Sequence, residues 1–238
     1  MKNPQEFLIA GKWRKGATTR EVHFPYNNDL VAEVYQASDA DLEDALAAAA
    51  KGFEITRALP AHARARILLN LLTQMEKNTE RLVETLVLEV GKTVGVARHE
   101  LRRAKETVQE AAEEAKRING EKIPTDGTEG GTGRMAFVRR QPLGPVLGIT
   151  PFNFPFSLAI HKLAPAVAAG NSFILKPPTA TPLTGLILGE MMLEAGFPPE
   201  AISVVTCAGA KAEKLVSDPR IKFLSFTGSS EVGWHLRA

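Results

Sequence analysis

The second half of the chain alternates short, almost continuously apolar runs with longer helix-like segments. Four apolar runs are predicted as strands, at residues 146–149, 172–175, 202–205 and 222–226. Helices are predicted between them, at residues 156–169, from 183 to about 195, and at 210–216. Strands without polar alternation, separated by helices, are typical of a parallel sheet that is covered on both faces. The pattern therefore predicts an α/β fold.

The N-terminal region opens with short strand-like pieces. Strands are predicted at residues 7–9, around Trp13 and at 31–35. Ser38 and Asp41 then have the spacing of a capping box, and apolar residues follow them at helical intervals. The first helix is therefore expected to start directly after Ser38.

Three further helices are predicted before residue 119. Pro60 is expected at the first position of one, and Gly91 is expected to end the next. The segment 93–118 is rich in charged residues, Glu100 among them, and is predicted to be a long exposed helix.

Residues 119–142 differ from their neighbours because a cluster of glycines interrupts them. Ile123 and the alternating residues 135–140 flank these glycines, so we interpret the segment as a two-stranded excursion with a loose tip. A phosphate-binding loop is the alternative, but these glycines neither follow a strong strand nor open a helix. The chain accordingly divides into residues 1–118, 119–142 and 143–238.

Composition narrows the class of protein. With 44% hydrophobic residues among 238, the chain can bury a core, which excludes a fully disordered protein. The net charge of +2 gives no reason to expect nucleic acid or an anionic membrane as a partner. The single cysteine excludes an intramolecular disulfide and fits a reducing compartment. No apolar run approaches the roughly 18 residues of a membrane span, and no secretory signal is evident, so a cytoplasmic protein is expected.

Candidate chemistry lies after the four predicted strands of the second half, at residues 150–153, 176–179, 206–209 and 227–230. Ligands of parallel sheets gather at the carboxyl ends of the strands. Lys176 is placed to reach a ribose hydroxyl or a phosphate. Ser229 precedes a predicted helix, where a hydroxyl and backbone amides suit a phosphate oxygen. Asn153, held between two aromatic residues and two prolines, is a candidate donor to a developing oxyanion.

Each of these residues has a purely structural alternative. Lys176 can be a solvated loop lysine, Ser229 an ordinary helix N-cap, and Asn153 the start of an Asx turn that begins the next helix. Cys207 is the only thiol, and no histidine is spaced to activate it, so a packing role is expected. The scattered histidines and carboxylates show no metal-ligand spacing.

Taken in order, several segments resemble the aldehyde dehydrogenase superfamily over essentially the whole chain. They are the hairpin-like residues 7–13, the Pro-Phe-Asn-Phe-Pro segment 151–155, the Leu-Lys-Pro segment 175–177 with Thr-Pro at 181–182, and residues 196–205 and 226–229. The resemblance implies a Rossmann-like parallel sheet of the family's cofactor domain, with an N-terminal helical arm. It also implies a protruding β-hairpin, residues 123–142, that would serve contacts in a homo-oligomer.

The resemblance further implies roles for individual residues. Asn153 would stabilise the oxyanion of a thiohemiacetal, Lys176 would bind the adenosine ribose, Gly209 would line the adenine pocket and Ser229 would meet the pyrophosphate. The remaining cofactor contacts would come from Ile149, Thr150, Pro151, Phe152, Phe226, Gly228 and Val232.

Three positions depart from the family pattern. Phe152 stands where tryptophan is usual, and Cys207 stands where a glycine is common. Thr179 stands where NAD-preferring members carry a glutamate that accepts hydrogen bonds from both ribose hydroxyls. A carboxylate there would repel a 2′-phosphate, whereas a threonine can donate to one, and Lys176 adds positive charge nearby. We therefore predict that NADP is allowed and moderately favoured over NAD.

The nucleophilic cysteine and the general-base glutamate of the family would lie beyond Ala238, and no residue of this chain matches either role. The chain alone is therefore predicted to have no dehydrogenase activity. It is interpreted as the cofactor-binding portion of an enzyme that oxidises an aldehyde to a carboxylic acid through a thioester. The alternative is a non-catalytic nucleotide-binding or assembly module. A third interpretation, an unrelated dinucleotide-binding oxidoreductase, is discounted because the chain lacks the Gly-x-Gly-x-x-Gly loop that usually follows the first strand of such proteins.

The substrate is only hinted at. Residues 156–162 resemble branches of the family that act on lactaldehyde, glyceraldehyde phosphates and phosphonoacetaldehyde. Arg98, Arg102 and Arg103 on the long predicted helix are candidates to meet an anionic aldehyde, with solvated surface arginines as the alternative.

Overall fold

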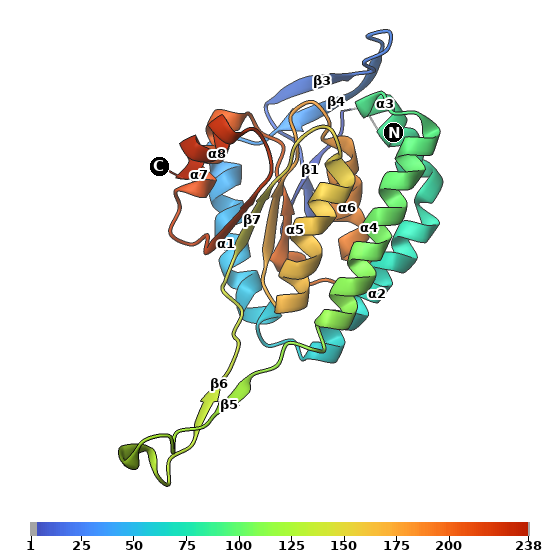
Figure 1. The fold of residues 1–238 in the computed structure, drawn as a ribbon. Coiled ribbons are helices and arrows are strands. Elements are labelled where there is room, and N and C mark those ends of the chain that lie inside the picture. The colour runs from blue at the N-terminus through green and yellow to red at the C-terminus, as the bar shows by residue number, and fades with distance from the viewer. Residues whose placement is uncertain (1–3, 238) are drawn as a thin grey trace.

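The computed structural model describes residues 4–237, and these form an α/β structure around a six-stranded sheet. Its strand order is β10-β7-β8-β9-β1-β2 (Figure 1). The four strands predicted in the second half run parallel to one another: β7 (Val146–Ile149), β8 (Phe173–Lys176), β9 (Ile202–Val204) and β10 (Phe223–Phe226). The predicted parallel sheet is therefore confirmed, with strand bounds shifted by at most one residue.

The sheet is mixed rather than wholly parallel. The N-terminal hairpin of β1 (Phe7–Ile9) and β2 (Lys12–Arg14) continues it, and β1 pairs antiparallel with β9. All three residues of β1 are buried, with Phe7 and Leu8 fully so. Burying this apolar run beside β9 joins the two ends of the described chain into one core.

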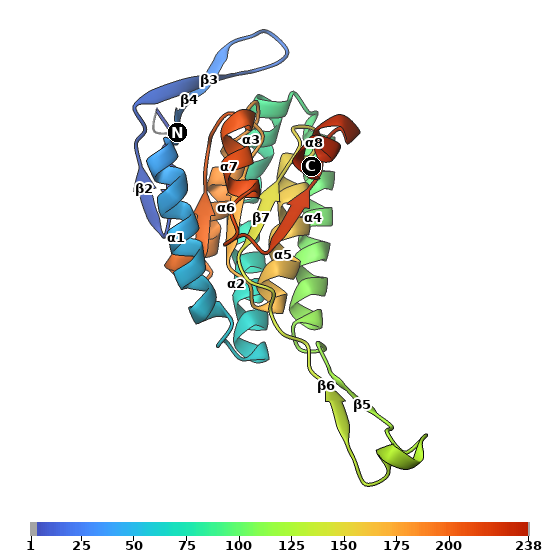
Figure 2. The same cartoon turned by 90° about the vertical axis from the view of Figure 1, so that its left-hand side faces the viewer.

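Helices cover both faces of the sheet (Figures 1 and 2). One face carries α1 (Asp39–Thr56) and α7 (Gly209–Val216), and the other carries α5 (Pro155–Ala169) and α6 (Leu183–Glu194). Outside α5 and α6 lie α2 (Ala61–Lys77), α3 (Thr79–Val90) and α4 (Val94–Glu114). The last helix is α8 (Ser230–Arg237), none of whose residues is buried.

Helix termini follow the predicted signals closely. Ser38 accepts from the Asp41 amide at 3.2 Å while Asp41 accepts from the Ser38 amide at 2.9 Å, so the capping box is confirmed. Gly91 and Gly170 end their helices at φ +77° and +89°, a left-handed conformation that glycine adopts without a Cβ clash. Pro60 is the N-cap rather than the first helical residue, because its ψ of 157° is still extended.

A second antiparallel ribbon was not fully anticipated. It pairs β3 (Thr18–His23) with β4 (Leu30–Gln36), and only β4 was predicted. The ribbon lies across the edge of the sheet where the parallel strands end (Figure 1). Thr206, just after β9, fixes it there: its hydroxyl donates to the Tyr35 carbonyl at 2.5 Å, and its own carbonyl accepts from the Ala37 amide at 2.8 Å.

The glycine-rich excursion is confirmed as a protruding hairpin of β5 (Glu121–Ile123) and β6 (Ala136–Val138), with the short 3₁₀ turn η1 (Glu129–Gly131) near its tip. It extends well away from the sheet and helices (Figures 1 and 2). Phe137 and Met135 are largely exposed on it.

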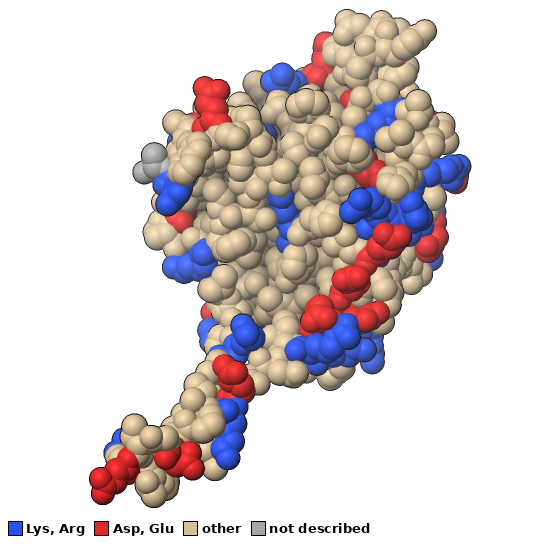
Figure 3. Space-filling view, in the orientation of Figure 1, with Lys and Arg blue, Asp and Glu red and all other residues tan. Residues whose placement is uncertain are grey.

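The helix α4 was expected to be exposed, but one of its faces is buried. Glu100 is 1% exposed there, and an apolar stripe that includes Leu101 and Val108 packs inward. The helix also ends at Glu114, earlier than predicted. Its outer face carries ion pairs such as Arg98–Glu80, and on the side shown in Figure 3 acidic and basic side chains mix along this helix. Across the described residues, no helix combines the length and apolar character needed to cross a membrane.

Two buried glutamates, Glu89 and Glu100, hold the first turns of the helices that follow β7 and β8. Glu89, from α3, accepts from the Leu183 and Thr184 amides at 2.7 and 3.1 Å and from the Thr184 hydroxyl at 2.7 Å. Burial raises the pKa of Glu89 to about 7, and the charge of Glu100 adds to this effect, while the three hydrogen bonds oppose it.

The raised pKa of Glu89 predicts a measurable loss of stability with rising pH. The unfolded glutamate ionises near pH 4.5, whereas the folded one keeps its proton up to about pH 7. Between these values the free energy of unfolding should fall by about 3 kcal/mol, because the unfolded state gives up the proton first. Glu89→Gln removes this contribution. Urea unfolding of both proteins from pH 5 to 8 checks it, and parallel curves for the two would contradict it.

Candidate functional site

The ends of the four parallel strands lie side by side at one edge of the sheet. Backbone hydrogen bonds continue past the strands: the Thr150 amide donates to the Lys176 carbonyl at 3.4 Å, and the Thr227 amide donates to the Ile149 carbonyl at 3.1 Å. The Val205 amide likewise donates to the Leu175 carbonyl at 2.9 Å. The segments predicted to carry the chemistry are therefore adjacent in the fold.

Lys176 is a buried cation at this edge, and not the solvated loop lysine of the alternative interpretation. Lys176 is 6% exposed, and its Nζ donates to the Thr179 hydroxyl at 3.2 Å. Burial lowers the pKa of Lys176, and the charge of Arg20 lowers it further. A buried lysine whose nearest partner is a neutral hydroxyl has hydrogen-bonding capacity left for a ligand.

Thr150, whose backbone amide bonds the Lys176 carbonyl, has an unsatisfied hydroxyl at the end of β7. Its side-chain Oγ1 is buried and has no hydrogen-bond partner among residues 4–237. Such orphaned buried hydroxyls are uncommon in folded proteins, because an unmade hydrogen bond is costly. The polar groups at the ends of β7 and β8 thus fit a polar ligand bound against them.

Cys207 is packed into the same region. It is 2% exposed, and burial raises the pKa of its thiol, although the nearby positive charges of Lys176 and Lys211 oppose the shift. A buried thiol with a raised pKa is a poor nucleophile. The expected packing role agrees with this environment.

The loop that carries Asn153 is exposed, and Phe152 on it is 64% exposed. The Asn153 Oδ1 accepts from the Phe154 amide at 3.1 Å, one residue on, so its side chain does not cap the next helix. Phe154 is the N-cap of α5 and makes no side-chain cap. The Asx-turn alternative therefore does not describe this loop, and the Asn153 amide nitrogen has no hydrogen-bond partner in the described part of the chain.

Glu100 caps α5 instead, a role that the sequence analysis missed. Its Oε1 accepts from the Phe156 and Ser157 amides at 3.1 and 3.0 Å, and its Oε2 pairs with Lys92. Lys92 Nζ also lies 3.7 Å from the centroid of the Phe154 ring. This buried pair therefore contacts Phe154, Phe156 and Ser157, which follow Asn153 closely in the chain.

The turn after β10 has the shape expected of a strand-to-helix phosphate site. A Cβ on Gly228 would lie 2.4 Å from the Phe226 ring, so only glycine fits against that side chain. The Ser229 hydroxyl accepts from the Val232 amide at 3.4 Å, which makes it an N-cap of α8. Residues 226–230 line an open hollow of about 470 Å³ with Trp234 and Arg237.

The remaining predicted cofactor residues surround this edge without forming one enclosed cavity. Gly209 is the exposed first residue of α7, and apart from its own stretch of the helix no described atom lies within 4 Å of where a Cβ would sit. Val232 on α8 is 45% exposed, and Pro151 is partly exposed on its loop. Thr179 lines a narrow crevice beneath the β3–β4 ribbon.

Lys162 is a further buried cation that the sequence analysis did not single out. It lies on α5, and its Nζ donates to the Thr227 hydroxyl at 2.5 Å, joining that helix to the turn after β10. Burial lowers its pKa. Its apolar helical context gives no sequence signal for this role.

A small pocket of about 250 Å³ lies beside Phe154, between α4 and α5. His99, Arg103 and His161 line it together with Glu100. Burial lowers the pKa of His161, and the charges of Arg103 and Lys162 lower it further. Within the described chain the Arg103 guanidinium has no ion-pair partner, so this pocket is locally positive.

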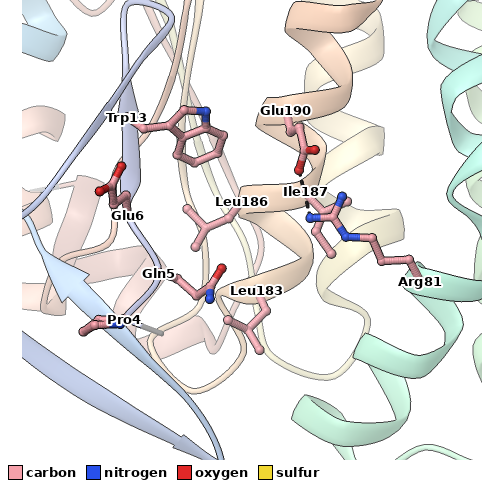
Figure 4. Close-up of a pocket in the computed structure, with 9 residues that line it drawn as sticks. All are labelled: Pro4, Gln5, Glu6, Trp13, Arg81, Leu183, Leu186, Ile187 and Glu190. Atoms are coloured by element: carbon pink, nitrogen blue, oxygen red, sulfur yellow. Dashed lines mark hydrogen bonds and ion pairs between the residues drawn. The ribbon is translucent and has the colours of Figure 1, made fainter. Parts of the chain in front are cut away.

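A separate hollow of about 470 Å³ lies between residues 4–6, β2, α3 and α6 (Figure 4). Its lining mixes apolar residues such as Trp13 and Leu186 with polar ones, among them the Arg81–Glu190 ion pair of 2.8 Å. None of the predicted site residues lines it. Residues 4–237 also contain no group of three or more histidines, cysteines, aspartates or glutamates arranged to hold a metal ion.

Comparison with known proteins supports the same fold. The chain is 39% identical to 3-sulfolactaldehyde dehydrogenase from Priestia aryabhattai over 231 residues, which are 97% of this chain and 48% of that protein. It superposes on aldehyde dehydrogenase 21 from Physcomitrella patens, solved with the product succinate, with a TM-score of 0.96 and 36% identity. All of this chain and 50% of that one are covered.

A third relative was solved with its cofactor. The NADP-dependent glyceraldehyde-3-phosphate dehydrogenase from Bacillus halodurans C-125, complexed with NADP, matches with a TM-score of 0.95 and 31% identity, over 99% of this chain and 50% of that one. The chain thus spans about half the length of the relatives it matches. The family model for the aldehyde dehydrogenase family matches residues 13–238. The chain therefore belongs to the aldehyde dehydrogenase family.

Proposed function

We propose that this chain is the cofactor-binding part of an enzyme that oxidises an aldehyde to a carboxylic acid with NAD or NADP. The observation that carries the proposal is the buried Lys176 at the carboxyl edge of a parallel sheet, where its amine bonds only the Thr179 hydroxyl within the described residues. Ligands of such sheets bind at this edge. The family membership supports the same chemistry.

In this proposal each residue has a defined task. Lys176 and Thr179 hold the adenosine ribose, while Ser229 and the first amides of α8 hold the pyrophosphate. The free amide of Asn153 donates to the oxyanion that forms when a thiolate attacks the aldehyde. When bound, the nicotinamide accepts a hydride from the substrate. The other predicted groove residues, Ile149, Thr150, Pro151, Phe152, Gly209, Phe226, Gly228 and Val232, shape the wall around it.

The nucleophile is not within this chain. Cys207 is buried with a raised pKa, and no other cysteine is present. We therefore propose that residues 1–238 alone bind the cofactor without oxidising aldehydes. A non-catalytic nucleotide-binding or assembly module is the second candidate. An in-frame continuation of the coding sequence that carries a cysteine motif would decide for the enzyme.

Calorimetric titration of the purified chain with NAD and NADP tests the proposal. Both cofactors should bind, with NADP bound more tightly because Thr179 replaces a repelling carboxylate. No NAD(P)H should form when an aldehyde is added. The absence of binding would contradict the cofactor role, a large preference for NAD would contradict the cofactor choice, and aldehyde-dependent NAD(P)H would contradict the inactivity.

The substrate proposed is an aldehyde that carries an anionic group. The pocket between α4 and α5 supports it, because Arg103 is unpaired and lies near His161 beside the Asn153 loop. The relatives described above are named for sulfolactaldehyde and glyceraldehyde-3-phosphate, or were solved with succinate, and each of these compounds has an acidic group.

Anion binding in this pocket should raise the pKa of His161, because a negative charge offsets Arg103 and Lys162. Proton NMR titration of the His161 ring in 50 mM succinate, against sodium chloride at equal ionic strength, measures the shift. We expect an upward shift of this pKa in succinate, which Arg103→Gln removes. An identical titration curve in both salts would contradict the proposed pocket.

The protruding hairpin is proposed as the contact between copies of this chain. Its exposed apolar residues Met135 and Phe137 have no partner surface within residues 4–237 and favour burial against another molecule. The partner proposed is a second copy in a homo-oligomer.

A further inference from the structure

The β3–β4 ribbon lies against the turn that holds Lys176 and Thr179, although about 140 residues separate the two segments. Arg20, Val22, Val34 and Gln36 form one face of the ribbon, since side chains two apart on a strand point the same way and Arg20 is paired with Val34. This face meets Pro177, Pro178, Thr179, Pro182, Thr206 and Cys207 across a narrow crevice.

Arg20 and Thr179 lie at the open rim of this crevice. Val22, Val34 and Cys207 are buried in it, whereas Arg20 is exposed and Thr179 is partly exposed. Both residues therefore line the same crevice and reach solvent.

The charges at this rim are unbalanced. Arg20 makes no ion pair or hydrogen bond through its side chain within the described residues, and its charge is felt by Lys176, whose amine bonds only the Thr179 hydroxyl. None of the described residues that line the crevice is acidic, and Glu21, next to Arg20 in the sequence, is paired with His23.

Two cations and a hydroxyl donor without a carboxylate form a site for a dianion. Phosphate oxygens accept charge-assisted hydrogen bonds from arginine and lysine, and arginine suits them because its planar fork donates twice. We propose that Arg20 is a specificity-determining residue that, with Lys176 and Thr179, binds the 2′-phosphate of NADP. The inference rests on the proposed cofactor function and adds a contact from the N-terminal ribbon.

The test compares two ligands that differ only in the 2′-phosphate. Calorimetry measures the binding of adenosine 2′,5′-bisphosphate and of 5′-AMP to the unaltered chain, to Arg20→Gln and to Arg20→Lys. The expected result for Arg20→Gln is a loss of about tenfold in affinity for the bisphosphate, with the affinity for 5′-AMP unchanged. Arg20→Lys should bind the bisphosphate with intermediate affinity, because the lysine ammonium keeps the positive charge but cannot donate two parallel hydrogen bonds as the guanidinium does.

Arg139→Gln is the matched control, because it removes one exposed arginine from the protruding hairpin, far from this rim. It should change neither affinity, and thermal unfolding verifies that Arg20→Gln keeps its fold. An unchanged bisphosphate affinity in Arg20→Gln, or an equal loss for both ligands, would overturn the role of Arg20. Failure of the unaltered chain to bind NAD, NADP or either adenosine ligand would overturn the proposed cofactor function itself.

Discussion

Replacement of Lys176 by methionine will weaken the binding of both NAD and NADP by about 10- to 100-fold, since hydrogen bonds to charged groups contribute ~1.5–3 kcal/mol. Lys176 is buried at the strand end proposed to bind the ribose, and Thr179 is its only hydrogen-bond partner in the described chain. Methionine keeps an unbranched apolar stem but cannot donate. Calorimetric titration with each cofactor measures the effect.

The same variant should be no less stable than the unaltered chain. Burial lowers the pKa of Lys176, so its charge is held at a cost to folding that methionine does not incur. Lys51→Met on the exposed side of α1 is the control for a lost charge and should leave binding unchanged. Full cofactor binding by Lys176→Met would contradict the assigned role, whereas a loss of stability would show that the lysine serves the fold.

Replacement of Glu100 by alanine will destabilise the protein by about 3–5 kcal/mol, the usual effect of leaving one partner of a buried ion pair alone. The Glu100 side chain is fully buried and that of Lys92 is 8% exposed, so the charge left on Lys92 cannot reach water without rearrangement. The Phe156 and Ser157 amides would also lose their acceptor. Urea unfolding and amide hydrogen exchange at these two residues measure both consequences.

Glu106→Ala on the same helix is the matched control, because Glu106 is exposed and its contact with Arg102 spans 3.9 Å. Such surface pairs contribute only about 0–1 kcal/mol. Glu100→Gln should fall between the two, since its amide oxygen still accepts from the α5 amides. Equal stability of the Glu100 and Glu106 variants would show that α5 does not depend on this pair.

The sheet was predictable because its strands are defined by local apolar runs. β7 to β10 were placed within one residue, and left-handed glycines at 91 and 170 ended helices where expected. A helix connects each of these strands to the next, and strands joined through a helix run parallel in the sheet. The positions of Lys176 and Ser229 at strand ends follow in turn.

What was missed depends on partners distant in sequence. β3 has one buried apolar residue, Val22, so its alternation is too weak to predict a strand. In the sequence Glu100 looks like a solvated glutamate on a charged helix. Its role depends on the Phe156 amide, which donates to it from 56 residues further along the chain. Arg20 shows no sequence signal at all, because its neighbours at the crevice come from the turns after β8 and β9.

The most direct test of the account is a crystal structure of the 238-residue chain with NADP bound. The adenosine ribose should lie on Lys176 and Thr179, the 2′-phosphate within hydrogen-bonding distance of Arg20, and the pyrophosphate at Ser229. NADP bound at any other place, with Lys176 still bonded only to Thr179, would contradict it.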